Sequence, residues 1–169
     1  MIIRKHTQGE TQSSAVYSDC ESYRYALTRS WEPENPRVLF VMLNPSKATE
    51  IRNDPTVERC ERRARALGYG AFRVVNIFAW RETNPQLMRK AADPIGPDND
   101  QSLLDAVDWA DQIVAAWGTH GAHLNRGPAV AELLWETGKP ISNLGLTKDG
   151  HPKHPLYIRY TQLPECWSR

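Results

Sequence analysis

The stretch RVLFVML, residues 37–43, places six apolar residues in succession after an arginine. A half-buried strand alternates apolar and polar side chains, whereas a strand covered on both faces is apolar throughout. The run therefore predicts a central strand with a layer of structure on each side. It ends at Asn44-Pro45-Ser46-Lys47, so an amide, a hydroxyl and an amine directly follow the buried strand.

From residue 37 onward, strand-like apolar runs alternate with segments of helical periodicity. Apolar residues at three- and four-residue spacing, with Asp54-Pro55 as a start signal and Gly68 as a stop signal, predict a helix over 55–67. Alternation of this kind favours a parallel sheet with helices on its faces. The other predicted elements are strands over 37–43, 71–80, 112–118 and 139–145 and helices over 98–110 and 127–138.

The first thirty residues follow a different pattern. In CESYRYALTRSW, residues 20–31, the side chains alternate with a period of two, as in a half-buried strand. We therefore predict a single domain over residues 1–169 of the α/β class. Its fold is expected to be a three-layer α/β/α arrangement with a central, mostly parallel sheet of about four strands and an N-terminal antiparallel edge strand or hairpin.

The composition argues against several functional classes. The chain is 40% hydrophobic and 24% charged, and its formal net charge of +1 provides no general attraction for nucleic acids or membranes. No apolar run approaches the ~20 residues of a membrane span, and the segment MIIRKHTQGETQ lacks a secretory signal. We therefore expect a cytoplasmic protein without a membrane partner, and the sequence leaves its oligomeric state open.

Cofactor and metal motifs are missing from the sequence. It contains no GxGxxG, GxxxxGK[ST], GxSxG or HExxH pattern, which disfavours dinucleotide, P-loop, serine hydrolase and zinc protease sites. Its three cysteines form no CxxC pair, and His151 and His154 lack the helical spacing of metal ligands. We expect neither a cofactor nor a metal ion.

Polar and aromatic side chains follow every predicted strand from residue 37 onward. Because ligands bind beyond the carboxyl ends of parallel strands, we expect these side chains to converge on one site. Asn44, His151 and His154 are the candidate catalytic residues, as a hydrogen-bonding amide and as a general acid or anion stabiliser. The candidate substrate-binding residues are Pro45, Ser46, Lys47, Asn76, Phe78, Trp80, Arg81, Trp117 and Gly118.

Each of these features also has a purely structural interpretation. Asn44-Pro45 can form a simple turn, and Asn76, expected to be buried, can be satisfied by the backbone. Three arginines of the first helix, Arg59, Arg62 and Arg63, lie on the face opposite its apolar residues and are candidate phosphate contacts. The alternative for them is a solvated face with Glu58 and Glu61 as salt partners.

At these residues the sequence resembles the domain-of-unknown-function family 1643, an uncharacterised bacterial and phage family. The matching segments follow one another in order over nearly the whole chain. They are YRYALTRSW, LFVMLNPSKA, NDPTVERC, VVNIFAWRETNP, DPIGPDND, AAWGTHG and LGLTKDGHPKHPLY.

A second similarity, to uracil-DNA-glycosylase-like proteins, is local. Those proteins are α/β/α domains with a Gly-x-Asn-Pro-type motif after the first parallel strand, a base-binding Asn and a His-Pro-Ser-type loop. Here Asn44-Pro45, Asn76 and either His151-Pro152 or His154-Pro155 are similar to the three motifs. The resemblance implies that Asn44 positions a hydrolytic water, Asn76 binds a base edge and a histidine stabilises the departing base.

The same resemblance implies that Phe78 or Trp80 stacks on a base extruded from nucleic acid. The first functional hypothesis is therefore a glycosylase-type hydrolase acting on a nucleobase, nucleotide or nucleic acid. A non-catalytic nucleotide or nucleic-acid binding module is the second. The third is a hydrolase or transferase for a small metabolite, with Ser46 as nucleophile and a histidine as base.

Overall fold

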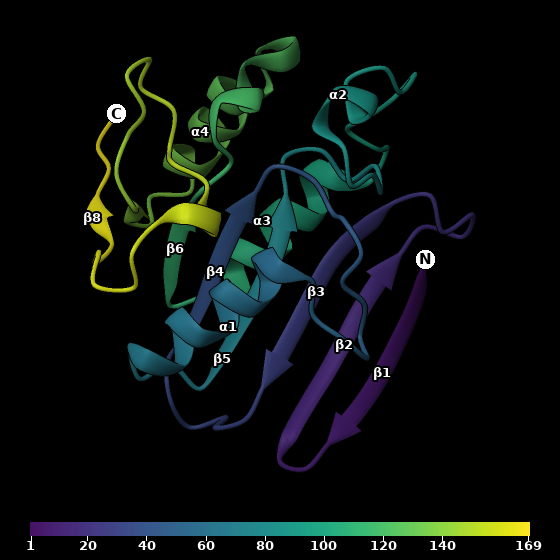
Figure 1. Cartoon of the computed structure of the whole chain (residues 1–169), viewed down its shortest axis with the longest axis vertical. Helices are drawn as coiled ribbons and strands as arrows, with labels where there is room; N and C mark the ends of the chain where they lie inside the picture. Colours follow the sequence, from purple (N-terminus) through teal and green to yellow (C-terminus); the bar gives the residue numbers. More distant parts are fainter.

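One mixed sheet of eight strands runs through the computed structural model, which describes all of residues 1–169. The strand order is β1-β2-β3-β5-β4-β6-β7-β8 (Figure 1). The strands are β1 (Ile2–Gln8), β2 (Thr11–Tyr17), β3 (Arg24–Ser30), β4 (Arg37–Met42), β5 (Ala71–Asn76), β6 (Gln112–Ala115), β7 (Ile141–Asn143) and β8 (Glu165–Cys166). The helices are α1 (Pro55–Ala66), α2 (Pro85–Met88), α3 (Asn99–Trp109), α4 (Arg126–Glu136) and the 3-10 segments η1 (Thr119–Asn125) and η2 (Pro155–Tyr157).

The strand pairings correct part of the predicted architecture. The α/β class is confirmed, and β5, β4, β6 and β7 pair in parallel, but four of the seven pairings in the sheet are antiparallel. The prediction of a mostly parallel sheet of about four strands is therefore wrong. The N-terminal segment supplies three antiparallel strands where one edge strand or hairpin was expected, and β8 adds an antiparallel strand at the opposite end.

Two hydrophobic cores lie on the two faces of the sheet. Along β4, Leu39 and Val41 belong to the core shared with α3 and α4, whereas Phe40 and Met42 belong to the core shared with α1. In Figure 1, α1 lies in front of the sheet and α3 lies behind it. The apolar run at residues 37–43 is thus covered on both sides, as its composition predicts. None of the helices has the length and apolar character needed to cross a membrane.

The order of the strands creates a switch point in the parallel part of the sheet. From β4 the chain passes through α1 to β5 on one side, whereas from β6 it passes through α4 to β7 on the other side. β4 and β6 are neighbours, so their connections leave in opposite directions. A crevice beyond the carboxyl ends of two such strands is the usual ligand site of an α/β sheet.

Helix α1 begins and ends where its sequence predicts. The side chain of Asp54 accepts a hydrogen bond from the Val57 N–H, and Pro55 occupies the first turn. Cys60 and Ala64 face the core. The predicted arginine face differs from expectation at two positions, because Arg63 is only 1% exposed and Arg59 is half-buried.

Arg59 and Arg63 hold the C-terminal segment against α1. Arg63 donates to the carbonyl oxygens of Gln162 (2.8 Å), Ile158 and Arg159, and Arg59 donates to those of Pro155 (3.0 Å) and Ile158. Only Arg62 remains on the surface, where it pairs with Glu58 at 2.8 Å. Both side chains are therefore engaged with the C-terminal segment, although Nε of Arg63 has no partner.

Two buried arginines of β3 hold the loop between β4 and α1. Nη1 of Arg24 donates to the carbonyl of Ala48, and Nη2 of Arg29 donates to that of Thr49, both at 2.8 Å. A register irregularity between β2 and β3 brings Arg24, in place of Tyr25, opposite Tyr17. The irregularity turns Arg24 toward the face of the sheet that α1 covers.

The first prediction concerns the two neighbouring arginines of α1. Arg63→Met leaves the carbonyl groups of Gln162 and Arg159 without their charged donor and that of Ile158 with Arg59 alone, so we expect the free energy of unfolding to fall by about 2–4 kcal/mol. Arg62→Met, the matched control, removes an exposed ion pair and is expected to leave the urea midpoint unchanged. Equal loss of stability in the two variants would contradict the assignment of Arg63 to the C-terminal segment.

Candidate functional site

A cavity of about 470 Å³, the main cavity, lies at the switch point between β4 and β6. Leu43 and Asn44 contribute from the end of β4, and Trp117 and Gly118 contribute from the end of β6. His154 closes it from the C-terminal segment. Segments far apart in the sequence therefore meet at the edge of the sheet where strand order favours a ligand site.

A small polar recess of about 30 Å³ lies next to the main cavity. Five residues line both spaces: Asn44, Ser46, Asp54, Thr56 and His154. Asn76 and Arg24 also line the recess. The three side chains singled out by the glycosylase-like resemblance, Asn44, Asn76 and His154, therefore surround one space.

Asn76 is the most unusual side chain of the recess. It is 1% exposed, and neither its Nδ2 nor its Oδ1 has a hydrogen-bond partner. A buried polar group without a partner costs roughly 1–3 kcal/mol. The Asn99 side chain donates to the backbone carbonyl of Asn76 at 2.9 Å, which fixes the end of β5 but leaves the Asn76 amide free.

Arg24 adds a positive charge to the same recess. It is 2% exposed, its Nε has no partner, and burial lowers its pKa to about 10, opposed by the negative charge of Asp54. The guanidinium stays protonated at neutral pH. The recess therefore contains unused donors on Arg24 and an unused donor and acceptor on Asn76.

Asn44 is oriented by the chain segment that runs past it. Its Nδ2 donates to the carbonyl of Glu82 at 2.5 Å, and the Glu82 N–H donates in turn to the carbonyl of Pro45 at 3.0 Å. Ser46 donates to the Thr83 hydroxyl at 3.1 Å. With its amide nitrogen held by a carbonyl, Asn44 has its Oδ1 left to accept a hydrogen bond.

His154 is neutral at physiological pH. Desolvation lowers its pKa to about 4, although the nearby charge of Asp54 opposes the shift. Nδ1 accepts a hydrogen bond from the Leu156 N–H at 3.3 Å, so the proton of the neutral ring lies on Nε2. Gly118, with a φ of +75°, lies so close to His154 that a Cβ at position 118 would lie 3.3 Å from the Cβ of His154.

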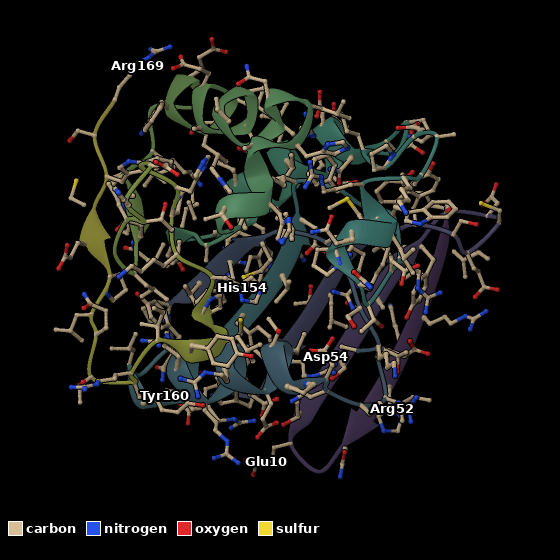
Figure 2. All side chains as sticks on the ribbon, turned by 45° about the horizontal axis from the view of Figure 1, so that its top comes forward. Glu10, Arg52, Asp54, His154, Tyr160 and Arg169 are labelled. Atoms are coloured by element: carbon tan, nitrogen blue, oxygen red, sulfur yellow. The ribbon has the colours of Figure 1, made fainter.

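Asp54 supplies a fixed carboxylate between these groups. Its Oδ1 accepts from the Val57 N–H at 2.9 Å and its Oδ2 from the Ala48 N–H at 3.2 Å. Figure 2 labels Asp54 in the central part of the molecule, with His154 on the C-terminal side and Arg52 toward the N-terminal strands. These two hydrogen bonds fix the orientation of the Asp54 carboxylate.

The remaining predicted site residues lie in other places. His151 lines a separate apolar cavity of about 220 Å³ with Trp135 and Trp167. Phe78 is buried in the core against the His123 ring, with 5.6 Å between ring centres. Of the two predicted histidines, only His154 reaches the recess.

A second open space, the groove, lies beside the main cavity and has a volume of about 500 Å³. Lys47, Trp80 and Arg81 line this groove and are absent from the walls of the main cavity. Trp117 is 1% exposed and is one of the residues that line the main cavity. Most of the predicted site residues therefore divide among the main cavity, the recess and the groove, whereas Pro45, Phe78 and His151 line none of the three.

Four residues that line the recess or the main cavity are absent from the predicted site: Arg24, Asp54, Glu82 and Thr83. Arg24 had a detectable signal, because a charged residue within the strand pattern YRYAL requires a partner. Asp54 was recognised only as a helix cap. No group of three or more His, Cys, Asp and Glu side chains is arranged to hold a metal ion.

The depressed pKa of His154 leads to a prediction about pH. Between its ordinary value of 6.5 and about 4, the unfolded chain binds a proton that the folded protein excludes, so stability falls as the pH falls through this window. We expect this residue to account for about 2–3 kcal/mol of the loss. His154→Gln should flatten the dependence of the urea-unfolding free energy on pH between 6.5 and 4.5. His151→Gln should follow the wild type, and a wild-type slope in His154→Gln would contradict the assignment.

Comparison with known proteins identifies the family and no activity. The family model described as "Protein of unknown function (DUF1643)" matches residues 24–156. No curated protein and no solved structure gives a significant match. The matched region runs from β3 to η2 and includes every residue that lines the recess. The chain belongs to the DUF1643 family.

Proposed function

We propose that the protein is a hydrolase that cleaves the N-glycosidic bond of a substrate carrying a nucleobase. The observation that carries the proposal is the Asn76 side chain, buried without a partner at a recess that adjoins a cavity of ligand size. A buried amide presents a donor and an acceptor side by side, which matches the paired groups on the edge of a nucleobase. An unpaired buried amide destabilises the free protein, and a ligand that forms the missing hydrogen bonds removes this penalty when it binds.

The sizes of the two spaces suggest how a base enters. The recess, at about 30 Å³, has room for one water or for the polar edge of a ring, whereas the main cavity, at about 470 Å³, has room for a nucleoside. In this arrangement the base edge displaces a water and pairs with Asn76. The sugar lies in the main cavity next to Asn44 and His154.

His154 is suited to stabilising the leaving base. As the bond between the base nitrogen and C1′ breaks, its electron pair remains on the base, which becomes anionic. The neutral imidazole donates its Nε2 proton as a hydrogen bond to that anion, and the charge of Arg24 favours it further. The hydrogen bond from the neutral imidazole becomes stronger as negative charge develops on the base. It therefore stabilises the transition state more than the bound substrate.

Asn44 and Asp54 are suited to positioning the attacking water. The Oδ1 of Asn44 accepts one hydrogen bond from the water, and the carboxylate of Asp54 supplies negative charge that stabilises an oxocarbenium-like sugar. The water oxygen bonds to C1′, one of its protons passes to the departing base, and the products are a free base and a sugar hydroxyl.

The other two hypotheses have weaker support. A nucleophilic role for Ser46 requires a base in hydrogen-bond contact, but its hydroxyl bonds to Thr83. A purely binding function does not by itself explain a neutral histidine beside a fixed carboxylate. Such a module would nevertheless bind the same ligands without turnover.

The test of the proposal is release of free base, measured by liquid chromatography and mass spectrometry. The substrate panel contains nucleosides, 5′-nucleotides and DNA and RNA oligonucleotides with normal, deaminated and alkylated bases. Wild-type protein should release base from at least one class. Asn76→Leu should reduce release at least ~100-fold while raising the unfolding free energy by about 1 kcal/mol, because an unpaired amide is replaced by an apolar group of similar shape.

His151→Gln is the control for this experiment, since His151 lines a different cavity, and it should release base at the wild-type rate. The combination of lost activity and retained or increased stability separates a ligand-binding amide from a structural one. Absence of base release from the entire panel, or wild-type turnover by Asn76→Leu, would rule out the proposal.

A further inference from the structure

The groove is the strongest unassigned feature of the molecule. It is a space of about 500 Å³ with three cationic side chains on its walls, Lys47, Arg52 and Arg81. Its two acidic residues are Glu21, which is already paired with Arg4 at 2.5 Å, and Glu82. Lys47 and Arg52 are exposed and make no ion pair within the protein. The groove therefore has an excess of positive charge in a protein with a net charge of only +1.

Arg81 is fixed in the groove by its surroundings. Its guanidinium lies over the Tyr17 ring at 4.9 Å, and its Nη1 donates to the carbonyl of Glu21 at 3.0 Å. The other guanidinium nitrogens have no partner, which leaves a planar donor set of the kind that binds phosphate oxygens. Arg81 is thus the positioned cation of the groove, and Lys47 and Arg52 are its exposed, unpaired cations.

A single ridge separates the groove from the main cavity. Ser46, Glu82 and Thr83 line both spaces, and the hydrogen bond between the Ser46 and Thr83 hydroxyls closes the ridge. A ligand that extends across this ridge places one part in the main cavity and the next part among the three cations. The backbone of a polynucleotide has this form, with a phosphate on either side of each nucleoside.

The groove also contains an aromatic ring. Trp80 is half-buried, packs edge-to-face on Tyr23 at 5.5 Å, and lines the groove with its remaining surface. Cationic side chains interleaved with an aromatic ring are the combination that binds single-stranded nucleic acids. Three cations can neutralise only a few phosphates. This number matches the phosphates of one short strand segment better than those of the two strands of a duplex.

We infer that the groove binds the phosphate backbone of a single nucleic-acid strand, one nucleoside of which occupies the main cavity with its base edge in the recess. The inference rests on the proposed function, because it assigns that nucleoside to the proposed site, and it specifies a polynucleotide as the substrate class. It also replaces the predicted phosphate contacts on α1, since Arg59 and Arg63 hold the C-terminal segment. Arg52, absent from the sequence prediction, joins Lys47 and Arg81 in their place.

The test is strand binding by the full chain, measured by fluorescence anisotropy with labelled twelve-nucleotide oligo(dT) and oligo(U). Wild-type affinity should fall with salt between 50 and 200 mM, with a slope in log–log form of about −2 for three phosphate contacts. The double variant Lys47→Ala/Arg52→Ala should bind at least tenfold more weakly at 50 mM salt and retain a slope of about −0.7.

The matched control is Lys148→Ala/Arg159→Ala, which removes one lysine and one arginine from exposed positions outside the groove. It should bind like the wild type. Equal weakening by both double variants would show a general charge effect and overturn the inference. Competition by unlabelled thymidine 5′-monophosphate as effective as that by the unlabelled strand would also overturn the inference. The site would then bind a mononucleotide rather than a strand.

The binding experiment and the base-release assay test the groove inference and the hydrolase proposal separately. Base release from free nucleosides without strand binding would uphold the hydrolase proposal and overturn the groove inference. Strand binding that depends on Lys47 and Arg52, without base release from any substrate, would uphold the groove inference and overturn the hydrolase.

Discussion

Hydrogen bonds from buried and half-buried arginines to backbone carbonyls hold together the loops that form the site. The loop after β4 is held by Arg24 and Arg29, and the C-terminal segment that carries His154 is held by Arg59 and Arg63. These loops have little regular structure, so their carbonyl groups need partners from elsewhere. A guanidinium offers several donors in fixed geometry and satisfies more than one carbonyl at once. The position of His154 and of the loop that carries Asp54 depends on these contacts.

The sheet determines where the loops are brought together. Because β4 and β6 are adjacent and their connections leave in opposite directions, a crevice opens beyond their carboxyl ends, and the arginine-held loops enclose it. The result is a polar recess with an unpaired amide, a neutral imidazole, a carboxylate and a guanidinium. Burial lowers the pKa of both Arg24 and His154, and the negative charge of Asp54 opposes both shifts.

Local sequence patterns predict the strands and helices near the site. The features that they do not predict depend on contacts between distant segments. The covered strand at 37–43, the cap at Asp54 and the burial of Asn76 follow from composition and spacing. The number of antiparallel strands depends on pairings between distant segments. The burial of Arg63 depends on a C-terminal segment nearly one hundred residues away. Likewise, nothing in the spacing of His151 and His154 indicates which one faces the recess; the fold of the intervening proline-rich chain decides it.

The most direct test of the account observes the Asn76 side chain itself. In a ¹⁵N-labelled sample titrated with free uracil, cytosine, adenine and guanine in turn, the side-chain amide resonance of Asn76 is assigned by its loss in Asn76→Leu. The account predicts that at least one base shifts this resonance to saturation and slows its hydrogen exchange, since the ligand supplies the missing partner. An Asn76 amide resonance that stays in place with every base, while the fold is intact, would contradict the claim that this buried amide is a ligand-binding group.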